Sequence, residues 1–184
     1  MSKKNNPSAG NMTQLKEVLS VMHKEGMIAY MKEQPGEYEE AVKLAITDEQ
    51  PYSWRAAWLL WSCMEENDPR LKKHTAKFIK ALDGKKDGHQ REIIKILMKM
   101  ELTERQESLL FDKCVSLWEQ TALSPSIRYT AFHFIRKIAA KYPELKKEIS
   151  ALFQQHFISP LSPGAKNGIL RMLREDGFFR DNAE

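Results

Sequence analysis

The sequence predicts an all-α fold, a right-handed α-α superhelix of about five stacked helical hairpins. One helical pattern recurs four times, and the cations that lead its copies are separated by 36, 37 and 38 residues. A period in that range is typical of stacked hairpins, each of which cannot bury its apolar face alone. No alternating apolar and polar run predicts a strand. The leading cations are Arg55, Arg91, Arg128 and Lys166.

An N-terminal pair of helices precedes the repeats. Apolar residues at helical spacing predict a helix that begins at 11–13, and Gly26 is expected to break or bend it. A second helical stretch, 27–33, ends at Pro35 and Gly36, which are a turn signal. This imperfect pair is the first of the five expected hairpins.

Four hairpins follow, and short turns separate their helices. Asp68 and Pro69 predict a helix start, with an N-cap residue before a proline at the first helical position. Gly177 is expected to end the last helix, and Phe178 and Phe179 to fold back over the open end of the stack. The hairpins pair 37–47 with 53–66, 69–82 with 89–101, 104–121 with 125–141, and 143–157 with 163–175.

Length and composition favour one folded domain. The 184 residues are 42% hydrophobic and 29% charged, which is typical of a globular chain. We expect a flexible tail over 1–11 and a single repeat domain over 12–184. No apolar run is long enough to span a membrane, and no secretory signal is apparent. Cys63 and Cys114 lie in helical patterns without metal-ligand spacing, so we expect two buried, unpaired thiols in a cytoplasmic protein.

The pattern resembles the HEAT-like and armadillo-type repeat families. The resemblance rests on the second-helix motif of 54–60 (WRAAWLL), its weaker copies and the break at 67–69 (NDP), and it covers about 37–175. More narrowly, 51–58 (PYSWRAAW) is similar to a group of small bacterial HEAT-like proteins, from which no activity follows. The resemblance implies that first helices line the convex side of the superhelix and second helices the concave side. It specifies architecture more than function.

The column of leading cations has two interpretations. In HEAT repeats, an arginine at this place commonly bonds an acidic residue of the preceding turn, which makes a structural ladder. Asp48 and Asp87 are the acids that would pair with Arg55 and Arg91.

The two later cations follow turns that hold serines and no acid. Arg128 and Lys166 would therefore be incomplete members of the ladder. The alternative is that they are free to hold an anion such as phosphate.

Three tryptophans share one face of the first second helix. Trp54, Trp58 and Trp61 are spaced by four and three residues. Aromatic stripes at this spacing usually belong to the core. Three rings are more than one helix interface normally needs, however, so one or two of them are alternatively a contact surface in the groove.

The net charge of +4 is unevenly distributed. The stretch 1–69 is acidic, whereas 70–106 and 126–184 are basic. A run of second-helix cations is usually a solvated face, but cations that converge in the groove would favour nucleic acid. The later basic residues on second helices are Arg91, Lys95, Lys99, Arg128, Arg136, Lys137, Lys141, Lys166, Arg171 and Arg174.

No catalytic signature is present. The five histidines are scattered and have no metal-ligand spacing. DNA alkylation repair glycosylases share this fold and carry an aspartate just after a groove tryptophan. Here Ser53 and Trp54 are followed by Arg55, so the catalytic acid is missing and we do not expect an enzyme, a metal or a cofactor.

The sequence therefore predicts a non-enzymatic binding scaffold that presents a concave surface to a protein partner. A preformed solenoid surface needs little ordering on binding. The alternative is binding of the DNA backbone through a basic groove. The contact candidates are Trp54, Arg55 and Trp58 early in the groove, and Arg91, Lys95, Arg128 and Arg136 later.

Overall fold

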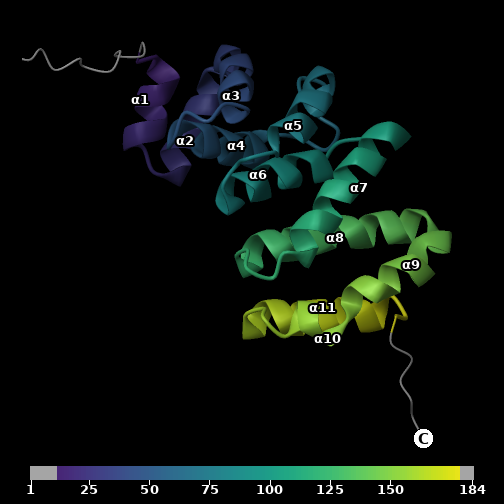
Figure 1. Ribbon diagram of the computed structural model, residues 1–184. Helices are drawn as coiled ribbons and strands as arrows, with labels where there is room; N and C mark the ends of the chain where they lie inside the picture. The colour runs from purple at the N-terminus through teal and green to yellow at the C-terminus, as the bar shows by residue number, and fades with distance from the viewer. Residues whose placement is uncertain (1–11, 179–184) are drawn as a thin grey trace, which may run out of the picture. The chain divides into compact units, whose positions relative to one another are not determined.

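The computed structural model describes residues 12–178, and within them every regular element is helical (Figure 1). The expected tail at 1–11 and Phe179 lie outside the described residues. Short 3₁₀ turns occupy Pro35–Glu37, Lys72–His74, Pro143–Leu145 and Ala151–Phe153. The α-helices are α1 (Gln14–Val21), α2 (Lys24–Glu33), α3 (Tyr38–Ala45), α4 (Tyr52–Cys63), α5 (Thr75–Ala81), α6 (Asp87–Met98), α7 (Glu104–Glu119), α8 (Pro125–Lys141), α9 (Lys146–Ser150), α10 (Gln155–Ile158) and α11 (Pro163–Glu175).

The helices of the expected repeat domain gather into two compact units, which divide after Cys63. The first unit contains α1 to α4, and the second contains α5 to α11. First and second helices of the hairpins follow one another along both units in the predicted order. The four predicted second helices correspond to α4, α6, α8 and α11. The all-α fold and the hairpin count are confirmed.

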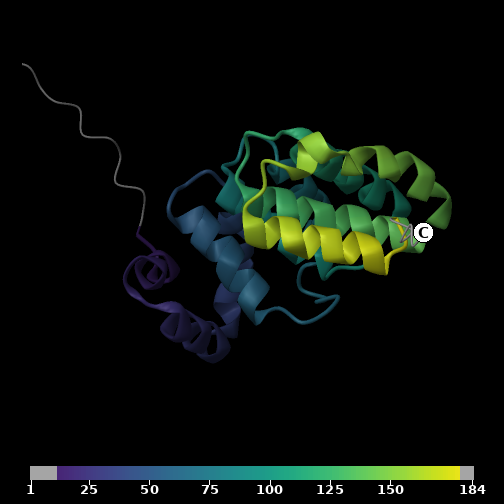
Figure 2. The same ribbon diagram turned by 90° about the horizontal axis from the view of Figure 1, so that it is seen from below.

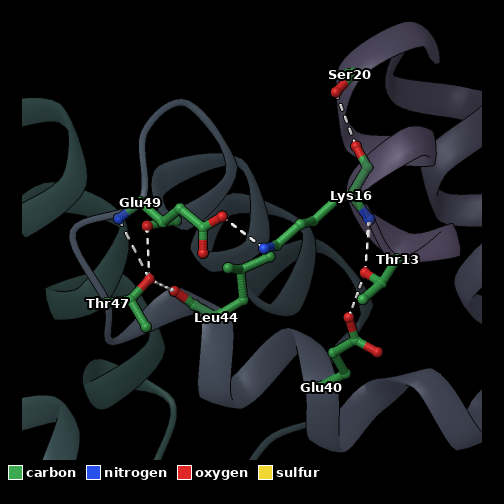
Figure 3. Close-up of polar contacts among 8 residues, drawn as sticks. Thr13, Lys16, Ser20, Glu40, Leu44, Thr47 and Glu49 are labelled. Carbon is green, nitrogen blue, oxygen red and sulfur yellow. Dashed lines mark hydrogen bonds and ion pairs between the residues drawn. The ribbon is translucent and has the colours of Figure 1, made fainter. Parts of the chain in front are cut away.

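Polar contacts fix α1 within the first unit (Figure 3). The Thr13 hydroxyl caps α1 by accepting from the Lys16 amide at 3.3 Å, and it donates to the Glu40 carboxylate of α3. The Lys16 ammonium pairs with Glu49 in the turn before α4. In the same turn, the Thr47 hydroxyl donates to the Leu44 carbonyl at 2.8 Å. The predicted helix start near Thr13 is confirmed.

The break after α1 lies earlier than the sequence predicts. Met22 and His23 have extended backbone conformations, whereas Gly26 lies inside α2. A side chain at Gly26 would approach the Met22 sulfur within 3.4 Å. The glycine thus lets Met22 lie close to α2, and it does not interrupt the helix.

The second unit is built around three successive second helices. Helix α8 packs against α6 and against α11. The first helices α5 and α7 pack against α6 and α8, respectively, and against each other. Figure 2 shows α11 (yellow) alongside α8 (green). Their inward faces are mainly apolar, and Ile93 on α6, Phe132 on α8 and Ile169 on α11 are fully buried. Burial of such side chains contributes roughly 1.5–3 kcal/mol each.

Two predicted helices of this unit differ from expectation. Asp68 and Pro69 do not start a helix, because the buried Asp68 carboxylate accepts from the Arg70 amide at 3.0 Å and from the Arg70 guanidinium. An aspartate that bonds the backbone two residues on favours a turn over a helix. The fourth first helix, predicted over 143–157, is divided into α9, a 3₁₀ turn and α10.

Gly177 ends α11 as predicted. Its φ of 73° is a left-handed conformation, which glycine adopts without steric cost. The Phe178 amide then donates to the Leu173 carbonyl at 3.0 Å. The Phe178 ring meets Phe153 edge to face, with 4.8 Å between centroids. Phe178 thus folds back onto the last hairpin, as the sequence predicts.

We predict opposite effects for two glycine substitutions in α11 and its cap. Gly177→Ala should lower the free energy of unfolding by about 1 kcal/mol, because alanine is strained at positive φ. Gly164→Ala should raise it by about 0.5 kcal/mol, because Gly164 is helical with open space around it. Urea denaturation followed by circular dichroism measures both. Equal effects of the two substitutions would contradict the assigned cap.

The two thiols differ in accessibility. Cys114 is fully buried, and burial raises the pKa of its thiol. Cys63, at the end of α4, is partly exposed, so the expectation that both are buried is wrong for Cys63. The thiolate is the reactive form.

A water-soluble disulfide reagent should label Cys63 in the native protein and Cys114 only after unfolding. Rapid labelling of both would contradict the burial of Cys114.

Candidate protein-binding site

The tryptophans of α4 lie on its outward side. The buried side of this helix consists mainly of small and aliphatic residues: Ser53, Ala56, Ala57, Leu59 and Leu60. Trp54 is 39% exposed, and Trp58 and Trp61 are half-buried. The core interpretation of this stripe is therefore wrong. Alanines on the inner side let α4 pack closely, which leaves the rings at the surface.

Two of these rings line a cavity in the first unit. Its volume is about 190 Å³. It opens where the extended residues between α1 and α2 pass α4. The cavity has mixed aromatic, thioether and cationic walls, and no carboxylate lines it. The lining residues are Met22, His23, Lys24, Met27, Trp54, Arg55 and Trp58.

Arg55 holds one wall of this cavity in place. Its Nη2 donates to the Met22 carbonyl at 2.9 Å, at the C-terminal end of α1. The predicted pair with Asp48 is wrong, because the guanidinium reaches a helix end instead, where carbonyls lack partners and favour cations. The Arg55 Nε is buried and has no hydrogen-bond partner among the residues that the structure describes.

Exposed apolar side chains contribute to the cavity lining. Met22 and Trp54 line it, and Val21, which is 69% exposed, directly precedes Met22. The Lys24 ammonium lies over the Trp58 ring, 5.7 Å from its centroid. Contiguous exposed apolar surface with aromatic and basic residues is characteristic of protein-binding surfaces.

In the second unit, Arg91 and Lys95 neutralise a buried carboxylate. Glu92 of α6 is fully buried, with Arg91 Nη2 at 2.7 Å from one oxygen and Lys95 Nζ at 2.7 Å from the other. Sequence reasoning missed Glu92, although an acid beside Ile93 with a cation on either side is a usable signal. The predicted pair of Arg91 with Asp87 is also wrong, because Asp87 accepts from the Ser124 amide at 2.7 Å.

Arg128 is not a surface residue. It is 1% exposed, and burial lowers the pKa of its guanidinium. The guanidinium donates to the carbonyls of Trp118 and Phe157 and stacks on the Trp118 ring at 4.8 Å. The interpretation that Arg128 is free to hold phosphate is therefore wrong. Lys166, its counterpart on α11, is partly exposed.

The remaining cations of α8 also contact the protein. Arg136 binds the Asp176 carboxylate through two nitrogens, and this hydrogen bond raises the pKa of the arginine. Lys137 donates to the Met98 carbonyl at 2.8 Å, and Lys141 pairs with Glu107 at 2.7 Å. These second-helix cations are largely engaged in structure.

Neither a metal site nor a membrane span is found in the part of the chain that the structure describes. No group of three His, Cys, Asp or Glu side chains within residues 12–178 is arranged to hold a metal ion. No helix in that range is long and apolar enough to cross a bilayer.

The fold defines an all-helical repeat protein. Comparison with known families gives the same class, since residues 11–175 match the HEAT repeat domain. The chain belongs to the HEAT repeat domain family, whose members generally act as protein-interaction scaffolds. No curated protein and no solved structure matches it.

We predict that Arg91 and Lys95 act in stability through Glu92. The double substitution Arg91→Met with Lys95→Met should lower the free energy of unfolding by about 3–5 kcal/mol, because it leaves a buried carboxylate uncompensated. The matched control replaces Lys77 and Lys80, two exposed lysines three positions apart on α5, by Met. The control should change stability by less than about 1 kcal/mol. Similar losses in the two variants, by urea denaturation, would contradict the role of Glu92.

Proposed function

We propose that this chain is a non-enzymatic binding scaffold that holds a protein partner on the second-helix face of its first unit. The observation that carries the proposal is the cavity lined by Trp54, Trp58 and Arg55. Tryptophan and arginine are the residue types that most often dominate binding energy at protein interfaces. The partner inserts an apolar side chain between the rings, and a carbonyl or carboxylate next to it accepts from Arg55.

The cavity is suited to recognition because its walls are preformed. The bond from Arg55 to the Met22 carbonyl fixes the loop between α1 and α2 against α4. A wall that is already ordered loses little conformational entropy when a partner binds. The sulfurs of Met22 and Met27 add polarizable, adaptable contacts to this rigid frame.

The DNA-backbone alternative has less support from the geometry. It requires second-helix cations that face solvent together. Arg128 is buried between carbonyls, and Arg91 and Arg136 are bonded to carboxylates. A cation already paired with a carboxylate releases few counterions from DNA.

The test compares partner capture by the full chain and two variants. Trp54→Ala removes the most exposed ring of the cavity, and Leu109→Ala removes a similarly exposed apolar side chain of α7 that lies outside the cavity lining. A protein captured from the native cell should be retained by Leu109→Ala and lost with Trp54→Ala. The isolated pair should lose at least about 2 kcal/mol, roughly 30-fold in Kd, as expected for a central aromatic anchor.

Nuclease treatment provides the second control. Capture of the partner should be unchanged after nuclease, and circular dichroism of both variants should match the wild type. Equal capture by Trp54→Ala and Leu109→Ala would contradict a role of this cavity. Capture that disappears with nuclease would favour nucleic acid as the partner.

A further inference from the structure

A second cavity, in the other unit, has the opposite charge. It lies between α7 and the corner where α8 ends, and its volume is about 440 Å³. It shares no residue with the tryptophan cavity. Its lining consists of Glu104, Glu107, Ser108, Phe111, Ile138, Tyr142, Glu144 and Leu145.

The floor of this cavity is apolar. Phe111 of α7 and Leu145 of the 3₁₀ turn after α8 are half-buried, and Ile138 beneath them is buried. An open cavity of this size with aromatic and aliphatic walls is large enough for one bulky side chain of a ligand.

The rim is acidic, and no Lys or Arg side chain is part of the lining. Glu107 is satisfied within the protein, by the Lys141 ammonium at 2.7 Å and the Tyr142 hydroxyl at 3.0 Å. Glu104 and Glu144 are exposed carboxylates for which the described residues provide no ion pair. Two negative charges without an ion pair among the described residues thus lie at the edge of an apolar floor.

The backbone under these carboxylates is well fixed. Glu104 is the first residue of α7, where Thr103 and Gln106 form a reciprocal capping box. Glu144 follows Pro143 in the 3₁₀ turn that ends at Leu145. A charge on a capped helix end or a proline-initiated turn is presented without much loss of backbone freedom on binding.

We propose that this acidic cavity docks a cationic segment of a partner protein, in which one apolar side chain is flanked by Lys or Arg. The apolar side chain enters the cavity over Phe111 and Leu145. The flanking cations pair with Glu104 and Glu144. Carboxylates at the rim repel nucleic acids and anionic lipid surfaces, so charge complementarity selects a basic peptide. This site goes beyond the tryptophan cavity and is tested independently of it.

The experiment selects ligands with the full chain from a random library of 12-residue peptides. Enriched peptides are synthesised, and their Kd values are measured by fluorescence polarization at 0.1 M salt. The variant is Glu104→Gln with Glu144→Gln. The matched control is Glu119→Gln with Glu148→Gln, which neutralises two exposed carboxylates of α7 and α9 outside the cavity lining. Trp54→Ala serves as a probe of the other site.

The site predicts a class of peptides with an apolar residue between Lys or Arg residues. Their Kd should rise about tenfold in the cavity variant, since partly exposed ion pairs contribute modestly and two are lost together. It should change less than twofold in the control variant and in Trp54→Ala. Replacing the apolar anchor by Ser should abolish binding.

Three outcomes would overturn the proposal. The first is a selection that yields no such peptides. The second is equal weakening by the cavity and control variants, or binding that persists without the apolar anchor, since both indicate non-specific charge attraction. The third is loss of these peptides in Trp54→Ala, which would assign them to the first unit.

Discussion

Basic side chains that bond the carbonyl groups at the ends of neighbouring helices hold this structure together. The last carbonyls of an α-helix have no partner within the helix and carry partial negative charge. Arg128 binds the carbonyls of Trp118, near the end of α7, and of Phe157 in α10. Lys137 binds the end of α6 through Met98, and Arg55 binds the end of α1 through Met22. Within each unit, a basic side chain of one helix thus donates hydrogen bonds to unpaired carbonyls near the end of another helix.

This use of cations decides which surfaces remain for recognition. The sequence suggests a basic groove, yet four second-helix guanidinium groups bond carbonyls or carboxylates of the protein itself: those of Arg55, Arg91, Arg128 and Arg136. What remains at the surface of the first unit is an aromatic cavity with two cations, Lys24 and Arg55. In the second unit it is a cavity with a carboxylate rim around Phe111. The two cavities differ in charge, and for this reason we propose a different kind of partner segment for each.

The architecture was predictable because periodic burial is written locally in the sequence. The second helices recur at 36 to 38 residues, and their buried faces follow the helical period, as on α4, α6 and α8. Their start signals also worked where a proline follows a serine, as at Ser124. Asp68 failed as a start signal because its carboxylate bonds Arg70 in a turn. Aspartate followed by proline is compatible with a turn as well as with a helix start.

The candidate sites were predictable only in part, because a pattern does not say which side of a helix faces the protein. The sequence left open whether Trp54 and Trp58 belong to the core or to the surface. In the structure, Ala56 and Ala57 occupy the buried side of α4, so the two tryptophans lie toward the surface. The sequence prediction placed Arg128 in the groove because its actual partners are not visible in the sequence. They are the backbone carbonyls of Trp118 and Phe157, which lie 10 and 29 residues away. Every residue has a backbone carbonyl, so residue type does not reveal such a partner. The acidic cavity escaped notice because α7 and the turn after α8 contribute to it together.

The most direct test of this account is the stability of Arg128→Met compared with that of Lys137→Met. Methionine keeps much of the volume of either side chain and removes the donors. Arg128→Met should lower the free energy of unfolding by about 2–4 kcal/mol, because the carbonyls of Trp118 and Phe157, in a buried and a part-buried hydrogen bond, lose their donor. Lys137→Met should lose less than half as much, since the Met98 carbonyl bonded by Lys137 lies at an exposed contact where water can replace the donor. An Arg128→Met protein as stable as the wild type would show that the packing does not depend on this cation.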